Sequence, residues 1–239
     1  MEKDLTELVE KLQQAVGASL KLVVLYGSAA SGDYQPQHSD LNVLCVLERL
    51  GAAELEKLHP AAAWWARKGH PAPLVFTLDE LRHSADVFAI ELLDIKASHR
   101  PLFGEDVLDS LEVPMNLHRQ QVERELRTNV IRLRQAFLAG PRDAPALQQL
   151  MNASVSTFAA LFRHALLALG EQPPESKRAV VNRIAVLLEL DPAAFHAVLD
   201  VREGRPRSCR EDVLATFGSY LVAVTRVAEE MDNRLAEPR

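Results

Sequence analysis

Two apolar segments joined by a glycine–serine turn and a polar stretch constrain the amino-terminal part of this chain more than any other feature. The run Leu22 to Tyr26 predicts a buried strand, which Gly27-Ser28 ends. A short helix is expected to open at Ala29, so that backbone N–H groups and the Ser28 hydroxyl face a bound phosphate. The run Leu41 to Leu47 predicts the next strand.

Two oxygen-bearing side chains lie at the start of that second strand. Side chains alternate between the faces of a strand, so Asp40 and Asn42 are expected to project from the same face. Oxygen ligands placed in this way suit a hard cation such as Mg²⁺. One of the ligands is charged, whereas the other is a neutral amide.

The arrangement resembles the nucleotidyltransferase superfamily, whose signature is an apolar strand, Gly-Ser, a gap of about ten residues, and Asp-x-Asp or Asp-x-Glu on the next strand. Gly27, Ser28 and Asp40 match this pattern position for position, and the gap Ala29 to Ser39 has the expected length. Asn42 departs from the pattern, since it replaces the second acid.

The resemblance implies a nucleotide and metal site. It assigns Asp40 as the catalytic and metal-binding residue, and Gly27, Ser28, Ser39 and Asn42 as nucleotide-binding residues. In the family's two-metal mechanism, carboxylates hold Mg²⁺ ions that bridge the nucleotide phosphates and activate an acceptor hydroxyl. With Asp40 alone, we expect a weak or single Mg²⁺ site that still holds a metal–nucleoside triphosphate complex.

A third acid is expected on a later strand of the same sheet. The strand predicted over Leu74 to Thr77 contains no carboxylate, and Asp79 and Glu80 fall in the first turn of a following helix. Glu91 and Asp94 occupy a further segment, Phe88 to Ala97, which is predicted as a strand. Whether either of them replaces the missing acid stays open at this point.

The pattern of apolar residues divides the chain near residue 112. Residues 1–112 are predicted to form a small mixed-sheet α/β domain and residues 113–239 an all-helical bundle. Besides the strands already described, helices are expected in the first part over about 4–16, 52–68 and 78–85, and in the second part around 122–137, 145–169, 177–190, 192–199 and 211–235.

A nucleotidyltransferase domain followed by a helical bundle resembles bacterial proteins that include the aminoglycoside nucleotidyltransferases. In those relatives the bundle helps to form the acceptor pocket, so the resemblance implies a site in the cleft between the two parts. The acceptor, a small molecule or a protein carrying a hydroxyl group, and the donor base are not encoded in any pattern that we recognise.

Composition and the amino-terminal sequence favour an intracellular protein. The net charge of −6 over 239 residues argues against a large nucleic-acid surface, and the two cysteines do not suggest a disulfide framework. The amino terminus lacks the pattern of an export signal, and no segment reaches the length of a membrane span. We therefore expect a cytoplasmic protein of undetermined oligomeric state.

These observations leave alternative functions open. The first is an enzyme that transfers a nucleoside monophosphate from a Mg-nucleoside triphosphate to a hydroxyl group. The second is a catalytically degenerate relative that binds nucleotide or a partner, because the second and third metal carboxylates are missing. The third is an interaction protein in which the α/β part is a scaffold.

Overall fold

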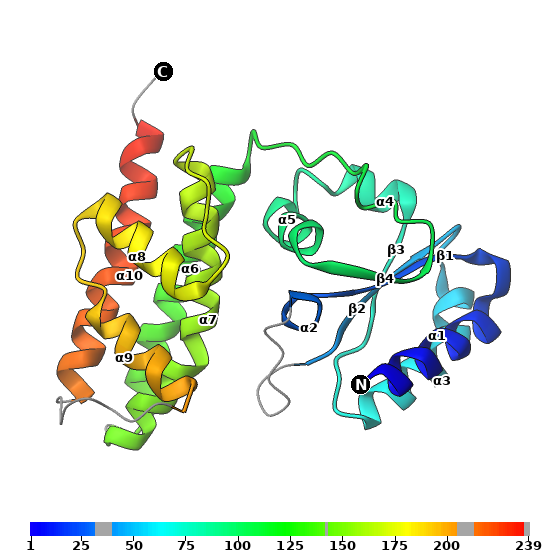
Figure 1. The fold of residues 1–239 in the computed structure, drawn as a ribbon, viewed down its shortest axis with the longest axis horizontal. Helices are drawn as coiled ribbons and strands as arrows, with labels where there is room; N and C mark the ends of the chain where they lie inside the picture. The colour runs from blue at the N-terminus through cyan, green and yellow to red at the C-terminus, as the bar shows by residue number, and fades with distance from the viewer. Residues whose placement is uncertain (32–39, 142, 205–212, 237–239) are drawn as a thin grey trace. The chain divides into compact units, whose positions relative to one another are not determined.

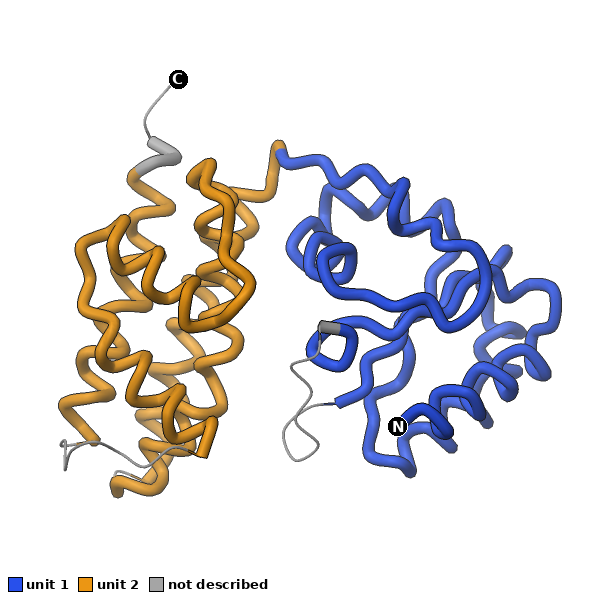
Figure 2. The backbone as a smooth tube through the Cα atoms, in the orientation of Figure 1, with its two compact units in different colours: residues 1–115 blue, residues 116–239 orange. Residues whose placement is uncertain are grey.

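The computed structural model describes residues 1–31, 40–141, 143–204 and 213–236. The chain forms two compact units, residues 1–115 and residues 116–239 (Figure 2). The first is built around a small mixed sheet and the second is entirely helical in its described residues, as the sequence predicted. Among the described residues, no helix is both long and apolar enough to cross a bilayer.

The sheet of the first unit has the strand order β3-β2-β1-β4 (Figure 1). Its strands are β1 (Leu20–Tyr26), β2 (Asn42–Leu47), β3 (Leu74–Thr77) and β4 (His99–Gly104). Strand β1 pairs antiparallel with both β2 and β4, whereas β2 and β3 are parallel. The end of β1 therefore lies beside the starts of β2 and β4, at one end of the sheet's strands.

Helices cover both faces of this sheet, which explains why β1 and β2 are almost continuously apolar. On one face, α1 (Glu2–Val16) and α3 (Ala52–Arg67) pack on alternate strand residues. On the other face lie α4 (Leu78–His83), α5 (Ala89–Ala97) and the segment that follows β4. Cys45, near the middle of β2, is completely buried.

Two elements differ from the sequence prediction. The segment 88–97 was predicted as a strand, but its residues from Ala89 to Ala97 form helix α5, with Ala89, Ile90, Leu92 and Ile95 buried. That spacing fits a helix packed on a sheet better than the alternation of a strand. The fourth strand is instead β4, whose Pro101 is tolerated because β4 pairs only with β1 and forms an edge of the sheet.

The second unit contains α6 (His118–Ala139), α7 (Ala144–Ala168), α8 (Lys177–Leu188), α9 (Ala193–Arg202) and α10 (Val213–Ala236). Helices α6, α7 and α10 pack against one another, and α8 and α9 pack on α7. The aromatic core consists of Phe158, Phe162, Phe195 and Tyr220, all nearly inaccessible.

A pair of buried histidines joins α6 to α7. His164 is 1% exposed, and its Nδ1 lies 3.0 Å from Nε2 of His118. The long-range partner from α6 satisfies the polar ring inside the core, which the sequence around His164 does not reveal.

Candidate nucleotide and metal site

The predicted site residues gather where β1 ends and β2 begins. Tyr26, the last residue of β1, is paired with Asn42, the first residue of β2. The Asn42 amide lies beside the turn. A Cβ atom added at Gly27 would be 3.5 Å from its Nδ2 atom, which is van der Waals contact. Asp40 precedes Asn42 by two residues and is exposed. The predicted Ser39 lies outside the described residues, as do the other residues between 32 and 39.

The turn after β1 has the backbone that a glycine permits. Gly27 has φ of +77°, a conformation that L-residues with side chains rarely adopt. Its N–H donates to the carbonyl of Ser98 (3.0 Å), which ties the end of β1 to the residue before β4. Its own carbonyl accepts from the N–H of Ala30 (2.9 Å) as helix α2 (Ser28–Ser31) begins. The predicted helix opening after Gly27 is thus present, although the described helix is only one turn long.

His70 is a neighbour of this site that the sequence analysis did not single out. The Leu41 N–H donates to Nδ1 of His70 (3.4 Å), and the His70 ring packs on Trp65 with 4.5 Å between ring centroids. Burial lowers the pKa of His70, and the negative charge of Asp40 partly opposes this shift. His70 therefore supports the chain between Asp40 and Asn42 as a neutral hydrogen-bond acceptor. Only a long-range contact, across 29 positions in sequence, reveals it.

Within the described residues, Asp40 is not part of any group of three neighbouring acid, histidine or cysteine side chains that could hold a metal ion. Glu91 and Asp94, the remaining alternatives for a third acid, lie on helix α5 rather than on a strand. Strand β3 carries no acid, and Asp79 and Glu80 begin α4, where Glu80 forms a capping box with Thr77.

The edge strand β4 begins with a histidine beside the end of β1. His99, the first residue of β4, is paired with Tyr26, so it lies on the opposite side of β1 from Asn42. Tyr26 between them is half-buried, and burial raises the pKa of its phenol. The basic residues next to His99 are engaged elsewhere. Lys96 donates to the carbonyls of Asp109 and Leu111, and Arg100 pairs with Glu2.

Residues 5–93 match the family model described as "Nucleotidyltransferase domain". The first unit thus carries a nucleotidyltransferase domain. The match contains Gly27, Ser28, Asp40 and Asn42, and it ends before β4. No curated protein sequence matches the chain.

The nucleotidyltransferase domain and the helical unit together are similar in fold to a solved structure of spectinomycin adenyltransferase AAD(9) from Enterococcus faecialis with ATP and spectinomycin. The two chains are 15% identical, with a TM-score of 0.57, and the similarity covers 94% of this chain and 98% of that one. A second match, to the tri-AMPylated Shewanella oneidensis HEPN toxin in complex with MNT antitoxin, has 16% identity and a TM-score of 0.31, and covers 55% of this chain and 96% of that one.

Proposed function

We propose that the nucleotidyltransferase domain binds a Mg-nucleoside triphosphate at the end of the sheet where β1 ends and β2 begins. The observation that carries the proposal is the packing of the Asn42 amide over the Gly27 turn, with Asp40 two residues away on the same strand entry. In this proposal, the backbone at Gly27 and Ser28 contacts phosphate oxygens, Asp40 is the protein's carboxylate ligand to Mg²⁺, and Asn42 contributes a neutral oxygen.

The proposed reaction is the transfer of a nucleoside monophosphate. An acceptor hydroxyl attacks the α-phosphorus, a new P–O bond forms, the bond from the α-phosphorus to the oxygen that bridges to the β-phosphate breaks, and pyrophosphate leaves. The hydroxyl proton passes to solvent or to a base of the acceptor complex. Since Asn42 adds no negative charge, Asp40 would be the one carboxylate of this pair to hold Mg²⁺, which when bound would lower the proton affinity of the hydroxyl. We therefore propose transfer that is slow compared with that of a site containing two carboxylates.

Binding without transfer is the second candidate function. It is favoured by the neutral side chain of Asn42 and by the positions of Glu91 and Asp94 on a helix. In that case the domain would hold a nucleotide for regulation or for contact with a partner. Either function would place the protein in the cytoplasm, where nucleoside triphosphates and Mg²⁺ are available.

ATP is the first donor to test, because the AAD(9) structure contains ATP, and spectinomycin is a reasonable first acceptor for the same reason. Other small-molecule hydroxyls and protein hydroxyls belong to the same class of acceptor. The fold similarity supports the choice of probes and does not select among them.

Calorimetry with each nucleoside triphosphate, with and without Mg²⁺, tests the binding step. We expect Mg²⁺-dependent binding by the wild type, and at least about tenfold weaker binding by Asp40→Ala, because the variant loses the charged metal ligand. Glu56→Ala is a matched control, since Glu56 is an exposed acid in α3, which follows the opposite end of β2. Equal affinities of the wild type and Asp40→Ala would refute the proposed site.

A further inference from the structure

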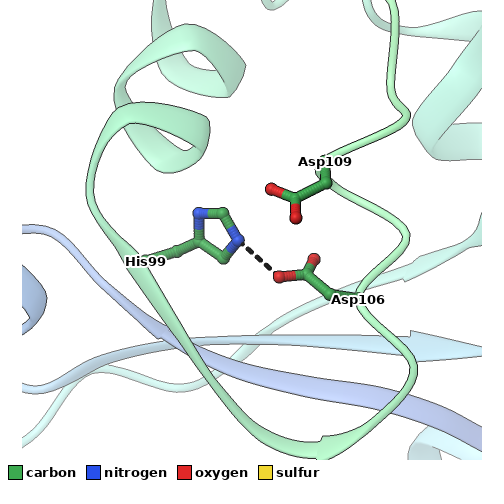
Figure 3. A group of neighbouring side chains, drawn as sticks. All are labelled: His99, Asp106 and Asp109. Carbon is green, nitrogen blue, oxygen red and sulfur yellow. Dashed lines mark hydrogen bonds and ion pairs between the residues drawn. The ribbon is translucent and has the colours of Figure 1, made fainter.

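Three polar side chains converge at the start of β4, outside the residues that match the nucleotidyltransferase domain (Figure 3). His99 is the first residue of β4, and Asp106 and Asp109 lie in the segment that returns after this strand. One nitrogen of His99 and one oxygen of each carboxylate all lie within 4.8 Å of one another. The side chains of His99 and Asp106 are 8% and 20% exposed, whereas Asp109 is exposed.

The ring of His99 is oriented by a backbone carbonyl. Its Nδ1 lies 3.0 Å from the carbonyl oxygen of Lys96, and because that oxygen only accepts, Nδ1 must carry the hydrogen and donate. The other nitrogen, Nε2, lies 2.8 Å from Oδ2 of Asp106. In a neutral ring with this tautomer, Nε2 presents a lone pair to a carboxylate oxygen, and two acceptors do not attract each other. A cation, either a proton or a metal ion, is therefore needed between them.

Hydrogen bonds that involve backbone groups position the two aspartates. Oδ1 of Asp106 accepts from the N–H of Leu108 (3.0 Å), which leaves Oδ2 directed at the histidine. The Lys96 ammonium donates to the backbone carbonyls of Asp109 and Leu111 and so anchors the chain that carries Asp109. A ligating histidine whose second N–H bonds a carbonyl, next to an oriented carboxylate, has the supporting contacts typical of metal sites.

We propose that His99 Nε2, Asp106 Oδ2 and a carboxylate oxygen of Asp109 bind a divalent transition-metal ion, with Zn²⁺ as the best fit. Zn²⁺ accepts one imidazole and two carboxylates at about 2.0–2.2 Å, and solvent can supply the fourth ligand. A tetrahedral site with bonds of that length places its ligand atoms about 3.3–3.6 Å apart, so His99 Nε2 and Asp106 Oδ2 must separate slightly and the exposed Asp109 must rotate inward to close the group. Mg²⁺ fits less well, because it prefers oxygen ligands throughout.

The charges in the site agree with this assignment. The two carboxylates together carry a charge of −2, which a divalent ion balances. The metal would join the segment after β4 to the start of that strand. Since His99 and Asn42 pair with opposite sides of Tyr26, their backbones lie about 10 Å apart, and the metal site uses none of the residues of the proposed nucleotide site.

A simple ion pair between His99 and Asp106, with no metal bound, would show the same contact. The substitution Asp106→Asn distinguishes an ion pair from a metal site. Asparagine keeps an oxygen for the Leu108 N–H, and its amide can donate to Nε2 of a neutral ring. The variant therefore preserves the local hydrogen bonds and removes only the anionic ligand. Asp109→Asn tests the third ligand in the same way.

The test is calorimetric titration of the full chain with Zn²⁺, after treatment with a chelator and with no nucleotide present. We expect one Zn²⁺ per chain at this site in the wild type, and affinity reduced at least about tenfold in Asp106→Asn and in His99→Gln. His83→Gln is the matched control, since His83 is an exposed histidine on α4, and it should bind Zn²⁺ as the wild type does. Zn²⁺ should also raise the melting temperature of the wild type and not that of Asp106→Asn.

Either of two outcomes would overturn the proposal. One is the absence of Zn²⁺ binding by the wild type. The other is equal affinity of the wild type, His99→Gln and a correctly folded Asp106→Asn. Asp40→Ala should keep its Zn²⁺ affinity, so failure of the proposed nucleotide site would leave this result unchanged.

Discussion

Asn42→Asp, the substitution that restores the second acid, gives the sharpest test of the metal argument. In the absence of metal it places two like charges at one strand entry. Two residues of extended chain separate Asp40 from position 42, which is about 6.6 Å. The repulsion is then about 0.6 kcal/mol at the dielectric constant of water, the appropriate limit because Asp40 is exposed. The metal-free variant should therefore be slightly less stable than the wild type.

With Mg²⁺ the sign of the effect reverses. A divalent ion about 4 Å from the centre of the new carboxylate gains about 2 kcal/mol at the same dielectric constant. The repulsion between the carboxylates is present with and without the metal and cancels from the affinity, so the gain of about 2 kcal/mol corresponds to about thirtyfold tighter binding of the metal–nucleotide complex. Transfer should rise by more than this factor, because negative charge at the metals also stabilises the transition state.

The assay combines calorimetry of Mg-ATP binding with measurement of pyrophosphate release in the presence of an acceptor. Asn116→Asp makes the same change in charge at an exposed position of the second unit and should leave both quantities unchanged. If Asn42→Asp binds Mg-ATP no more tightly than the wild type, or if the wild type already turns over rapidly and the substitution is neutral, the reasoning about the missing acid is wrong.

Further predictions concern stability. Gly104 has φ of +83°, and an added Cβ would lie 1.9 Å from the carbonyl oxygen of Lys21. Gly104→Ala should therefore lower the free energy of unfolding by about 3 kcal/mol or more in urea titrations, whereas Gly69→Ala, with an open space around it, should lose only about 1 kcal/mol. A loss at Gly104 no larger than at Gly69 would contradict the clash. Burial lowers the pKa of His70, so the unfolded chain takes up this proton first as the pH falls, and stability should decrease from about pH 6.5 down to the folded pKa. His70→Asn should flatten that slope in melting experiments, and an unchanged slope would exclude His70 as its source. Asp143 caps α7 by accepting the N–H of Ala146 (2.8 Å), so Asp143→Ala should cost about 1 kcal/mol in the same urea assay. An unchanged midpoint would show that the exposed cap contributes nothing.

The central strands and the turn between them were predictable because local chemistry determines them. The apolar residues of β1 and β2 are interrupted by Gly27-Ser28, and a glycine is needed for the positive φ that the turn contains. The antiparallel register then brings Asn42 beside the turn. The match of residues 5–93 to the nucleotidyltransferase domain and the fold similarity to AAD(9) confirm the family resemblance of this part of the chain.

The remaining features depend on contacts that a local pattern does not contain. The segment Phe88 to Ala97 was predicted as a strand, because a short apolar run fits both strand and helical periods. It is helical because Ile90, Leu92 and Ile95 are buried together beside the sheet. Strand β4 was not predicted, because Pro101 and its polar neighbours are tolerated only in an edge strand.

Among the candidate site residues, the same division holds. Gly27 and Asn42 were found from their spacing, whereas His70 and His99 acquire their positions through partners distant in sequence or through a strand that was not predicted. The acceptors and donors around His99 also come from both ends of β4, from Lys96 to Leu108. Sequence spacing alone does not bring those groups together.

The burial of Cys45 has a practical consequence for the chemistry of the chain. Loss of solvation raises the pKa of its thiol to about 12, so at neutral pH the sulfur is almost never a thiolate, the form that attacks electrophiles. Alkylation of this sulfur then requires strand β2 to separate from its covering helices. The rate at which a reagent labels Cys45 would thus report how often the centre of the sheet opens in otherwise native molecules.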